Sequence, residues 1–204
     1  MKILFLTNNP VAHSLADWLK KNACENVIMF EQKLTEQEVS IIKPDWIVSY
    51  SYRYMIRPEV LLKLNGKVIN LHISLLPWNK GADPNFWSIV NNTPKGVTIH
   101  YVDKSLDTGA ILLQKSLSFD DEIETIGSSY QKLHRELQLL FQANWDKLKN
   151  GTVPSIPQPA TGSFHYKKEF ESVKHILGNE GWSVTLKELK KRYNNLLLNV
   201  AAPN

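Results

Sequence analysis

Short apolar runs alternate with amphipathic segments along the first part of the chain. Residues 2–7, 26–30, 46–50 and 68–71 are apolar runs with the length of buried strands. The segments between them, 11–22, 35–42 and 58–64, place apolar side chains at helical spacing. Strands that alternate with helices predict an α/β fold with a doubly wound, mostly parallel sheet.

The pattern continues with further elements of both kinds. A short helix is predicted over 84–90, where Pro84 follows Asp83. Residues 96–102 alternate as a strand does, which places His100 on a sheet face and favours a structural role for it. A further strand is predicted over 110–117, and one long amphipathic helix over 120–150, which Gly151 ends.

The composition changes after Gly151. Three prolines, at 154, 157 and 159, indicate an extended linker. Residues 163–166 are predicted to form a short hairpin arm, and residues 185–198 a final amphipathic helix. We therefore expect a principal domain over 1–150 and a small C-terminal extension over 151–204.

Bulk composition narrows the class of protein. The chain has 204 residues, of which 43% are hydrophobic, and this favours a globular fold. A net charge of +4 suits an anionic small molecule as well as nucleic acid. The single cysteine, Cys24, rules out an internal disulfide and favours a reducing compartment. The N-terminal apolar run is too short for a signal peptide and no stretch has the length of a membrane span, so we expect a cytoplasmic protein.

Polar side chains follow the central predicted strand. Asn70 and His72 stand two residues apart, so they project from the same face at its carboxyl end, where open α/β sheets bind ligands. Asp107 lies in a tight loop after the strand that contains His100. The alternative is a core histidine that a neighbouring asparagine satisfies.

These groups favour one kind of chemistry. Ser74 lacks the strand-turn-helix context of a nucleophile elbow, which disfavours a serine hydrolase. An amide, an imidazole and a carboxylate can stabilise an oxyanion and move a proton while an external nucleophile attacks a carbonyl. We therefore expect direct acyl-type transfer without a covalent enzyme intermediate.

Several of these motifs occur together in a known order. An Asn-x-His-x-Ser-Leu-Leu-Pro run at 70–77 is followed by Lys-Gly-Ala-Asp-Pro at 80–84, Gly-Val-Thr at 96–98 and Leu-Asp-Thr-Gly at 106–109. Over residues 1–150 the chain resembles the 10-formyltetrahydrofolate-dependent formyltransferases. The resemblance implies a Rossmann-like catalytic domain in which a substrate amine attacks the formyl group of 10-formyltetrahydrofolate.

The resemblance also assigns roles to residues. Asn70 and His72 would hydrogen-bond the oxyanion, and Asp107 would position His72 or a bridging water. The folate pterin would lie against the two loops that contain Tyr54, Met55, Ile56, Val102, Asp103 and Leu106. Substrate contacts would come from Lys80, Trp87 and Asn9, although Trp87 is as well explained as a core aromatic.

Two features that the chain lacks narrow the choice of acceptor amine. The first loop, Thr-Asn-Asn-Pro at 7–10, has no glycine, unlike the glycinamide ribonucleotide enzymes, and the extension is shorter than the C-terminal barrel of the methionyl-tRNA enzymes. The run Leu-Leu-Pro-Trp-Asn-Lys-Gly at 75–81 resembles short sugar N-formyltransferases and the formylation domain of gramicidin synthetase. We expect a nucleotide-linked 4-amino-4,6-dideoxy sugar, with a UDP-linked pseudaminic acid precursor or a dTDP-linked hexose as examples.

Other interpretations of the sequence remain open. The acceptor could instead be a carrier-bound aminoacyl group, or the chain could be a non-catalytic folate- or nucleotide-binding module. His13, His134, His165 and His175 have no metal-ligand spacing, so no metal is expected. No nucleic acid or membrane partner is expected, and homodimerisation through the C-terminal helix is left open.

Overall fold

The computed structural model describes residues 1–23 and 25–201. The chain divides into two compact units, each built from three segments. Unit 1 comprises Met1–His72, Thr98–Gln114 and Leu137–Gln158, and unit 2 comprises Ile73–Val97, Lys115–Glu136 and Pro159–Asn204. The predicted boundary at residue 150 stays a prediction, since each unit draws on both sides of it.

A six-stranded sheet with the strand order β2-β1-β3-β4-β6-β7 contains the predicted strands. β1 (Lys2–Leu6) pairs in parallel with β2 (Asn26–Phe30) and with β3 (Trp46–Tyr50). β3 pairs in parallel with β4 (Val68–His72), and β4 pairs antiparallel with β6 (Gly96–Tyr101). β7 (Ile111–Ser116) follows at the edge. The predicted mixed α/β, mostly parallel sheet is confirmed.

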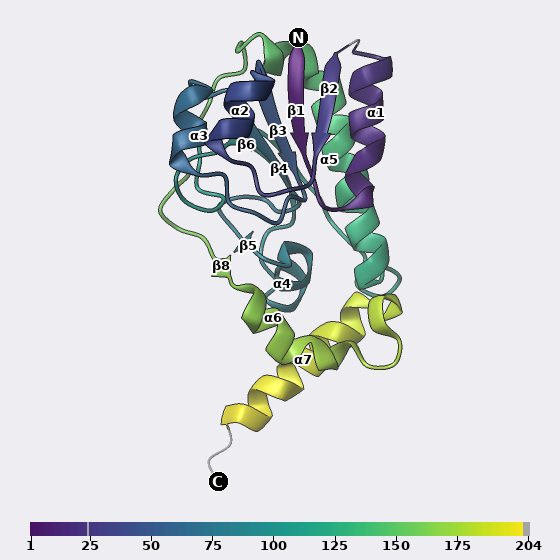
Figure 1. The fold of residues 1–204 in the computed structure, drawn as a ribbon. Coiled ribbons are helices and arrows are strands. Elements are labelled where there is room, and N and C mark those ends of the chain that lie inside the picture. Colours follow the sequence, from purple (N-terminus) through teal and green to yellow (C-terminus); the bar gives the residue numbers. More distant parts are fainter. Residues whose placement is uncertain (24, 202–204) are drawn as a thin grey trace. The chain divides into compact units, whose positions relative to one another are not determined.

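Helices cover both faces of the sheet in unit 1 (Figure 1). α2 (Glu36–Ile42) and α3 (Pro58–Lys63) lie on one face, where Val39 and Val60 pack against Leu4 and Ile47. α1 (His13–Lys21), which the 3-10 turn η1 (Pro10–Ala12) precedes, lies on the other face with the last part of α5 (Ile126–Lys149). β3 and β4, almost entirely buried between these layers, are therefore near-continuous apolar runs rather than alternating ones.

Unit 2 has a core of its own, built around α4 (Pro84–Val90), every residue of which is buried. The C-terminal extension supplies the other side of this core through α6 (Lys167–Val173), two 3-10 turns, η2 (Lys174–Leu177) and η3 (Gly181–Ser183), and α7 (Leu186–Ala201). The buried apolar side chains are Phe86, Trp87, Ile89, Val90, Ile126, Ile176, Val184, Leu186 and Leu189.

Two elements differ from the sequence expectation. The long helix begins at Ile126 rather than at residue 120, because Thr125 and Ser128 cap its N-terminus reciprocally, at 2.9 Å and 3.0 Å. The segment 163–166 does not fold back on itself as a hairpin. Instead β8 (Phe164–His165) pairs in parallel with β5 (Lys80–Gly81), a long-range pairing that local sequence does not encode.

Candidate active site

Antiparallel pairing of β4 with β6 brings three polar side chains to one sheet face. Asn70 lies opposite His100 in the register, and His72 lies opposite Thr98. Because opposite residues in a ladder project to the same side, Asn70, His72 and His100 share a face of the sheet in unit 1. Both imidazoles are buried, at 8% and 1% exposed, so water screens their contacts little.

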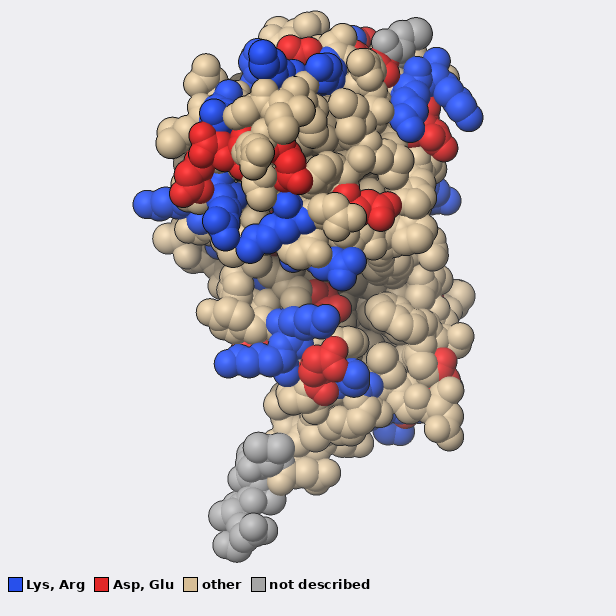
Figure 2. Space-filling model, in the orientation of Figure 1, with Lys and Arg blue, Asp and Glu red and all other residues tan. Residues whose placement is uncertain are grey.

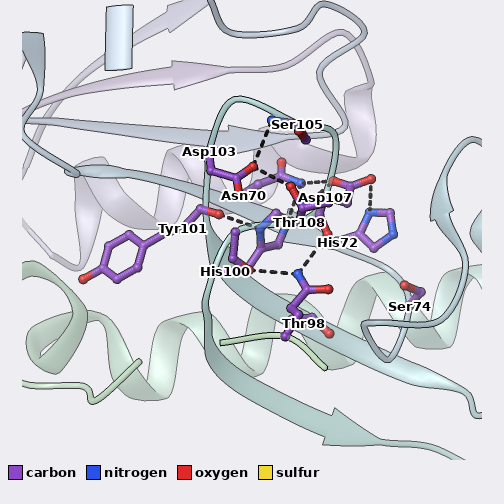
Figure 3. A network of polar contacts seen from close by, with 12 residues as sticks. Asn70, His72, Ser74, Thr98, His100, Tyr101, Asp103, Ser105, Asp107 and Thr108 are labelled. Carbon is purple, nitrogen blue, oxygen red and sulfur yellow. Dashed lines mark hydrogen bonds and ion pairs between the residues drawn. The ribbon is translucent and has the colours of Figure 1, made fainter. Parts of the chain in front are cut away.

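Asp107 completes the cluster from the loop after β6 (Figure 3). Its Oδ1 accepts a hydrogen bond from Asn70 Nδ2 at 3.2 Å and lies 3.6 Å from His100 Nε2, while its Oδ2 lies 3.7 Å from His72 Nδ1. The carboxylate is 7% exposed. One buried negative charge therefore contacts the amide and both imidazoles. Asn70, His72, His100 and Asp107 are called the polar network below.

The network defines the orientation of the Asn70 amide. His100 Nδ1 lies 2.7 Å from the carbonyl oxygen of Tyr101, so this nitrogen carries the proton and donates it. When the imidazole carries only this proton, His100 Nε2 is an acceptor for Asn70 Nδ2, which lies 3.2 Å from it. Since the same Nδ2 also faces the Asp107 carboxylate, the Asn70 carbonyl oxygen must point away from both groups.

Hydrogen bonds from side chains hold the loop that contains Asp107 in place. Asp107 has a left-handed backbone with φ +56°, which is uncommon for a residue other than glycine. Asp103 Oδ1 accepts from Thr108 Oγ1 at 2.6 Å, and Gln158 Nε2 donates to the carbonyl oxygens of Asp107 and Gly109 at 2.9 Å and 2.8 Å. A Cβ at Gly109 would lie 1.8 Å from the Tyr101 carbonyl oxygen, so only glycine fits there.

Two members of this arrangement carry no clear signal in the sequence. Alternation places His100 on a sheet face, but it does not reveal that β6 pairs with β4 in the register that puts His100 beside Asn70. Gln158 lies in the proline-rich linker, where nothing in the sequence indicates a contact with residues 107–109. By contrast, Asn70, His72 and Asp107 do come together.

A cavity of about 390 Å³ opens beside the same loop in unit 1. It is lined by Pro58, Leu61, Leu62, Asn65, Gly66, Val68, Val102 and Asp103. Most of these residues are apolar and two are polar, a composition typical of pockets for small organic ligands. Asp103 both lines this cavity and holds Thr108 of the loop that contains Asp107.

The polar network lies within a segment of the chain that matches a known protein family. The model of the Formyl transferase family matches residues 6–143, which include Asn70, His72 and Asp107. The chain belongs to the formyl transferase family. The family members are enzymes that transfer a formyl group.

Two kinds of relative stand out. The chain is 30% identical over 164 residues to a methionyl-tRNA formyltransferase of Desulforamulus reducens, covering 74% of this chain and 51% of that protein. It therefore spans about half the length of the curated relatives it matches.

Among solved structures, the chain is similar to the formyltransferase PseJ from Anoxybacillus kamchatkensis, crystallised in complex with UDP-4,6-dideoxy-4-formamido-L-AltNAc and tetrahydrofolate. The two sequences are 38% identical, and the structures superpose with a TM-score of 0.86 over 94% of this chain and all of PseJ. A sugar N-formyltransferase candidate from Mycobacterium tuberculosis is 26% identical with a TM-score of 0.75, over 85% of this chain and 78% of that one.

The residues predicted to hold folate lie in different environments. Val102 and Asp103 line the cavity, whereas Ile56 is 7% exposed and belongs to the core beneath it. Tyr54 is half-buried and contacts the ring of Tyr52, and Met55 is 56% exposed. Leu106 is 42% exposed on the Asp107 loop. Their roles toward a ligand stay predictions.

The loop after β3, which contains Tyr54 to Ile56, is fastened by two side chains. Asn8 Oδ1 accepts from the backbone N–H of Arg53 at 3.0 Å, while Asn8 Nδ2 donates to the carbonyl oxygen of Glu31 at 2.7 Å. The Tyr52 hydroxyl accepts from the N–H of Leu34 at 2.9 Å, and burial raises the pKa of this phenol above its ordinary value. The loop that follows β3 is thus tied to the ends of β1 and β2.

The residues predicted to bind substrate are distributed over both units. Asn9, in unit 1, uses its Oδ1 to accept from the N–H of Val11 at 3.1 Å and so caps η1. Lys80 and Trp87 belong to unit 2. Lys80 is half-buried and has no ion-pair partner among the residues described. Trp87 is 4% exposed, so the alternative of a core aromatic describes its position.

Ser74 and the histidines outside the polar network show no catalytic arrangement of their own. Ser74 Oγ donates to the carbonyl oxygen of Trp78 at 2.8 Å and is 1% exposed, so this hydroxyl stabilises its own loop in unit 2. Within residues 1–23 and 25–201, no group of three or more His, Cys, Asp or Glu side chains has an arrangement that could hold a metal ion. None of the helices described there combines the length and apolar content that crossing a membrane requires.

Proposed function

We propose that this chain is an N-formyltransferase that moves the formyl group of 10-formyltetrahydrofolate to the 4-amino group of a nucleotide-linked 4-amino-4,6-dideoxy sugar. The observation that carries this proposal is the contact of one buried carboxylate, Asp107, with Asn70 and with both imidazoles. The polar network contains donors for an oxyanion and groups that can relay a proton, and none of its four side chains is a typical nucleophile for acyl transfer. The attacking group must therefore come from the substrate.

The polar network would act as follows. The substrate amine attacks the formyl carbon, so that a C–N bond forms and the carbonyl oxygen becomes an oxyanion. His72 and Asn70 donate hydrogen bonds to this oxygen. The contacts of Asn70 Nδ2 with His100 and Asp107, both at 3.2 Å, lie at the long end of the hydrogen-bond range, so one of its N–H groups can be shared with the oxyanion. The bond from carbon to the folate N10 then breaks, and the proton lost by the amine reaches N10 by way of His72 or a water that Asp107 positions.

Folate as the donor is supported by the cavity and by the relatives. A volume of about 390 Å³ with apolar walls suits a pterin, and Val102 and Asp103 line it. PseJ was crystallised with tetrahydrofolate. We assign Val102 and Asp103 to the pterin, with Tyr54, Met55, Ile56 and Leu106 on the loops around it. No metal takes part in this proposal.

The sugar acceptor is supported by the similarity to PseJ, whose structure holds a UDP-linked 4-formamido-4,6-dideoxy sugar and is covered over its full length by this chain. The methionyl-tRNA formyltransferases of Desulforamulus reducens and Thermodesulfovibrio yellowstonii match over 51% and 43% of their length. We therefore propose a UDP-linked amino sugar as acceptor, with Lys80, Trp87 and Asn9 on its side of the reaction. Synthesis of surface glycans in the cytoplasm is the role that such a product would serve.

The test is formyl transfer itself. Purified protein with 10-formyltetrahydrofolate is given UDP-linked and dTDP-linked 4-amino-4,6-dideoxy sugars, methionyl-tRNA, or an aminoacyl-phosphopantetheine. Product mass and the absorbance of released tetrahydrofolate are measured. We expect turnover with a UDP-linked sugar, and a loss of about a hundredfold or more in kcat for His72→Ala and Asp107→Asn.

Each other outcome has a definite meaning. Turnover with methionyl-tRNA or with the carrier-linked amine alone would replace the sugar by that acceptor. Tight folate binding without turnover of any amine would indicate a non-catalytic binding module. Full activity of His72→Ala would contradict the role given to the polar network.

A further inference from the structure

We infer that the exposed face of the two-stranded β5–β8 ribbon is the subsite for the nucleoside diphosphate of the substrate, with the base stacked on one ring of the Phe164–Tyr166 pair and in contact with the edge of the other, and with the diphosphate beside Lys80. This inference rests on the proposed function, because it names the part of the molecule that would hold the nucleotide. All of the residues concerned belong to unit 2. Lys80, Phe164 and Tyr166 are called the ribbon face below.

The ribbon has two faces with different characters. Lys80 lies beside Phe164 in the parallel register, and Gly81 lies beside His165. Side chains that are neighbours in a ladder share a face, and those two residues apart do so as well, so Lys80, Phe164 and Tyr166 project together. His165 projects the other way and stacks on Trp87, with ring centroids 4.2 Å apart and planes at 8°.

The covered face leaves no platform for a base. The Trp87 ring is stacked on His165 and also contacts the edges of Phe86 and Tyr193. Only 4% of Trp87 is exposed, and its Nε1 is a buried donor without a hydrogen-bond partner among the residues described. Trp87 can therefore contribute one hydrogen bond at its edge but no stacking surface. A nucleobase needs aromatic faces elsewhere.

The ribbon face supplies such rings. Phe164 is 38% exposed and Tyr166 is 58% exposed, and their centroids lie 4.8 Å apart in an edge-to-face arrangement. Adjacent exposed aromatics of this kind are uncommon on a surface unless they bind something, and bases stack on aromatic rings with little dependence on sequence. Gly81 allows the close β5–β8 pairing, because a Cβ there would lie 2.3 Å from the His165 carbonyl oxygen.

Lysines lie beside these rings, and the neighbouring carboxylate of Glu169 is hydrogen-bonded to the backbone N–H of Tyr166 at 3.1 Å and lies 3.2 Å from His165 Nδ1. Lys80 has no carboxylate within ion-pair distance among the described residues, and Lys168 Nζ lies 5.5 Å from the centroid of Tyr166. Lys167 and Lys168 are exposed at the start of α6, and Figure 2 shows basic and acidic side chains together over the region of α6. A diphosphate has the complementary charge, and Lys80 can meet it as a point charge. A pantetheine arm has no ring to stack, so the aromatic pair favours a nucleotide.

The ribbon is rigidly built, as a binding surface must be. Lys80 N donates to the Ser163 carbonyl oxygen at 3.0 Å, and Ala82 N donates to the His165 carbonyl oxygen at 2.9 Å. Buried Asn79 reinforces this pairing, because its N–H donates to Ser163 Oγ at 2.8 Å. The two rings are therefore held on an ordered backbone, which lowers the entropy cost of binding.

Calorimetric titration of the full chain with UDP tests the subsite. We expect Phe164→Leu and Tyr166→Leu each to weaken UDP binding tenfold or more, because leucine keeps apolar bulk but has no aromatic face. Phe164→Tyr and Tyr166→Phe should bind nearly as the wild type does. Trp182→Leu is the matched control, since Trp182 is 51% exposed in unit 2 outside the ribbon. Lys80→Gln should weaken binding of UDP but not of uridine.

The outcomes separate this inference from the proposed function. Equal UDP binding by wild type and both leucine variants, or no UDP binding by the wild type, overturns the subsite, even if a UDP-linked sugar is formylated. Ring-dependent UDP binding without turnover of any sugar supports the subsite and overturns the proposed function. A dimer in sedimentation that dissociates in the leucine variants, with UDP binding unchanged, would assign the ribbon face to a second copy of the chain.

Discussion

The backbone of Asp107 shows how a single residue depends on a distant one. A left-handed conformation costs an aspartate roughly 1 kcal/mol or more, so neighbouring contacts must hold it. Gln158 does so by donating to the carbonyl oxygens of Asp107 and Gly109. This places the carboxylate against Asn70 and both imidazoles.

If Asp107 has the proposed role, replacing Gln158 by leucine should lower kcat for formyl transfer by about tenfold or more, because small displacements of a catalytic group are costly. The KM for folate should change less, since the cavity is lined by other residues. Gln37→Leu, at an exposed position in unit 1, is the control. An unchanged kcat with a raised KM would show that Gln158 serves the ligand rather than Asp107.

His134 makes stability depend on pH in unit 2. It is 2% exposed, and burial lowers its pKa from 6.5 to about 4. Above the pKa that His134 has in the unfolded chain, its imidazole is neutral in both the folded and the unfolded state, so the folded protein keeps its full stability. As the pH falls below 6.5, His134 binds a proton in the unfolded chain but stays neutral in the folded chain. The free energy of unfolding should then fall by about 2 kcal/mol between pH ~7 and ~5.

Urea titrations at the two pH values measure this. His134→Gln should remove the part of the pH dependence that the buried imidazole causes, although it starts from a lower stability. His175→Gln, which removes an exposed histidine, should leave the slope unchanged. If wild type and His134→Gln lose equal stability on acidification, another group is responsible.

At the residue scale, the sequence predicts the parts of the site that lie in one local pattern. Asn70 and His72 share a strand, and their spacing determines that they project together. His100 and Gln158 join the site through an antiparallel register and a linker contact. Neither has a periodicity or motif of its own, so both lie beyond what the pattern of the chain encodes.

Among the elements, those with local signals are predicted best. The capping box at the start of α2 is present, with Thr35 N donating to Glu38 Oε2 at 2.7 Å. Strands β1 to β4 follow from apolar runs. The β5–β8 pairing escapes prediction because it joins two-residue strands far apart in the sequence. Helix α6 escapes it because the helix has only 7 residues, of which Phe170 and Val173 alone pack against the core of unit 2.

Removing the cap should destabilise α2 measurably. Thr35→Ala leaves the first turn with an unsatisfied N–H, so the free energy of unfolding should fall by about 1 kcal/mol. Thr35→Ser, which keeps the hydroxyl, should restore most of it. Urea midpoints at constant slope measure both. A Thr35→Ala protein as stable as the wild type would mean that packing of Val39, rather than the cap, determines where α2 begins.

At the scale of the whole molecule, the C-terminal extension is part of a core rather than an appendage. Leu189 of α7 is fully buried with Phe86 and Ile89 of α4. The sequence predicts an extension that is too small for a confident independent domain, and in the structure its apolar side chains pack on residues 84–90. The sequence does not predict that α7 packs against α4, because the pairing of helices that are distant in the sequence has no local sequence pattern.

Two leucines of α7 test this role. Leu189→Ala should lower the free energy of unfolding by about 2–5 kcal/mol, because it leaves a cavity in the core of unit 2. Leu197→Ala, at a 50% exposed position on the same helix, should change it by less than about 0.5 kcal/mol. Denaturant unfolding followed by tryptophan fluorescence compares them. Equal effects would show that α7 contributes little to that core.

The Gln158 contact also has a consequence for synthesis of the protein. Unit 1 takes its last segment from Leu137–Gln158, and the carbonyl oxygen of Asp107 accepts its hydrogen bond from the final residue of that segment. A nascent chain that has emerged as far as Asn70, His72 and Asp107 still lacks this donor. The loop that contains Asp107 can therefore gain its full set of hydrogen bonds only after Gln158 has left the ribosome.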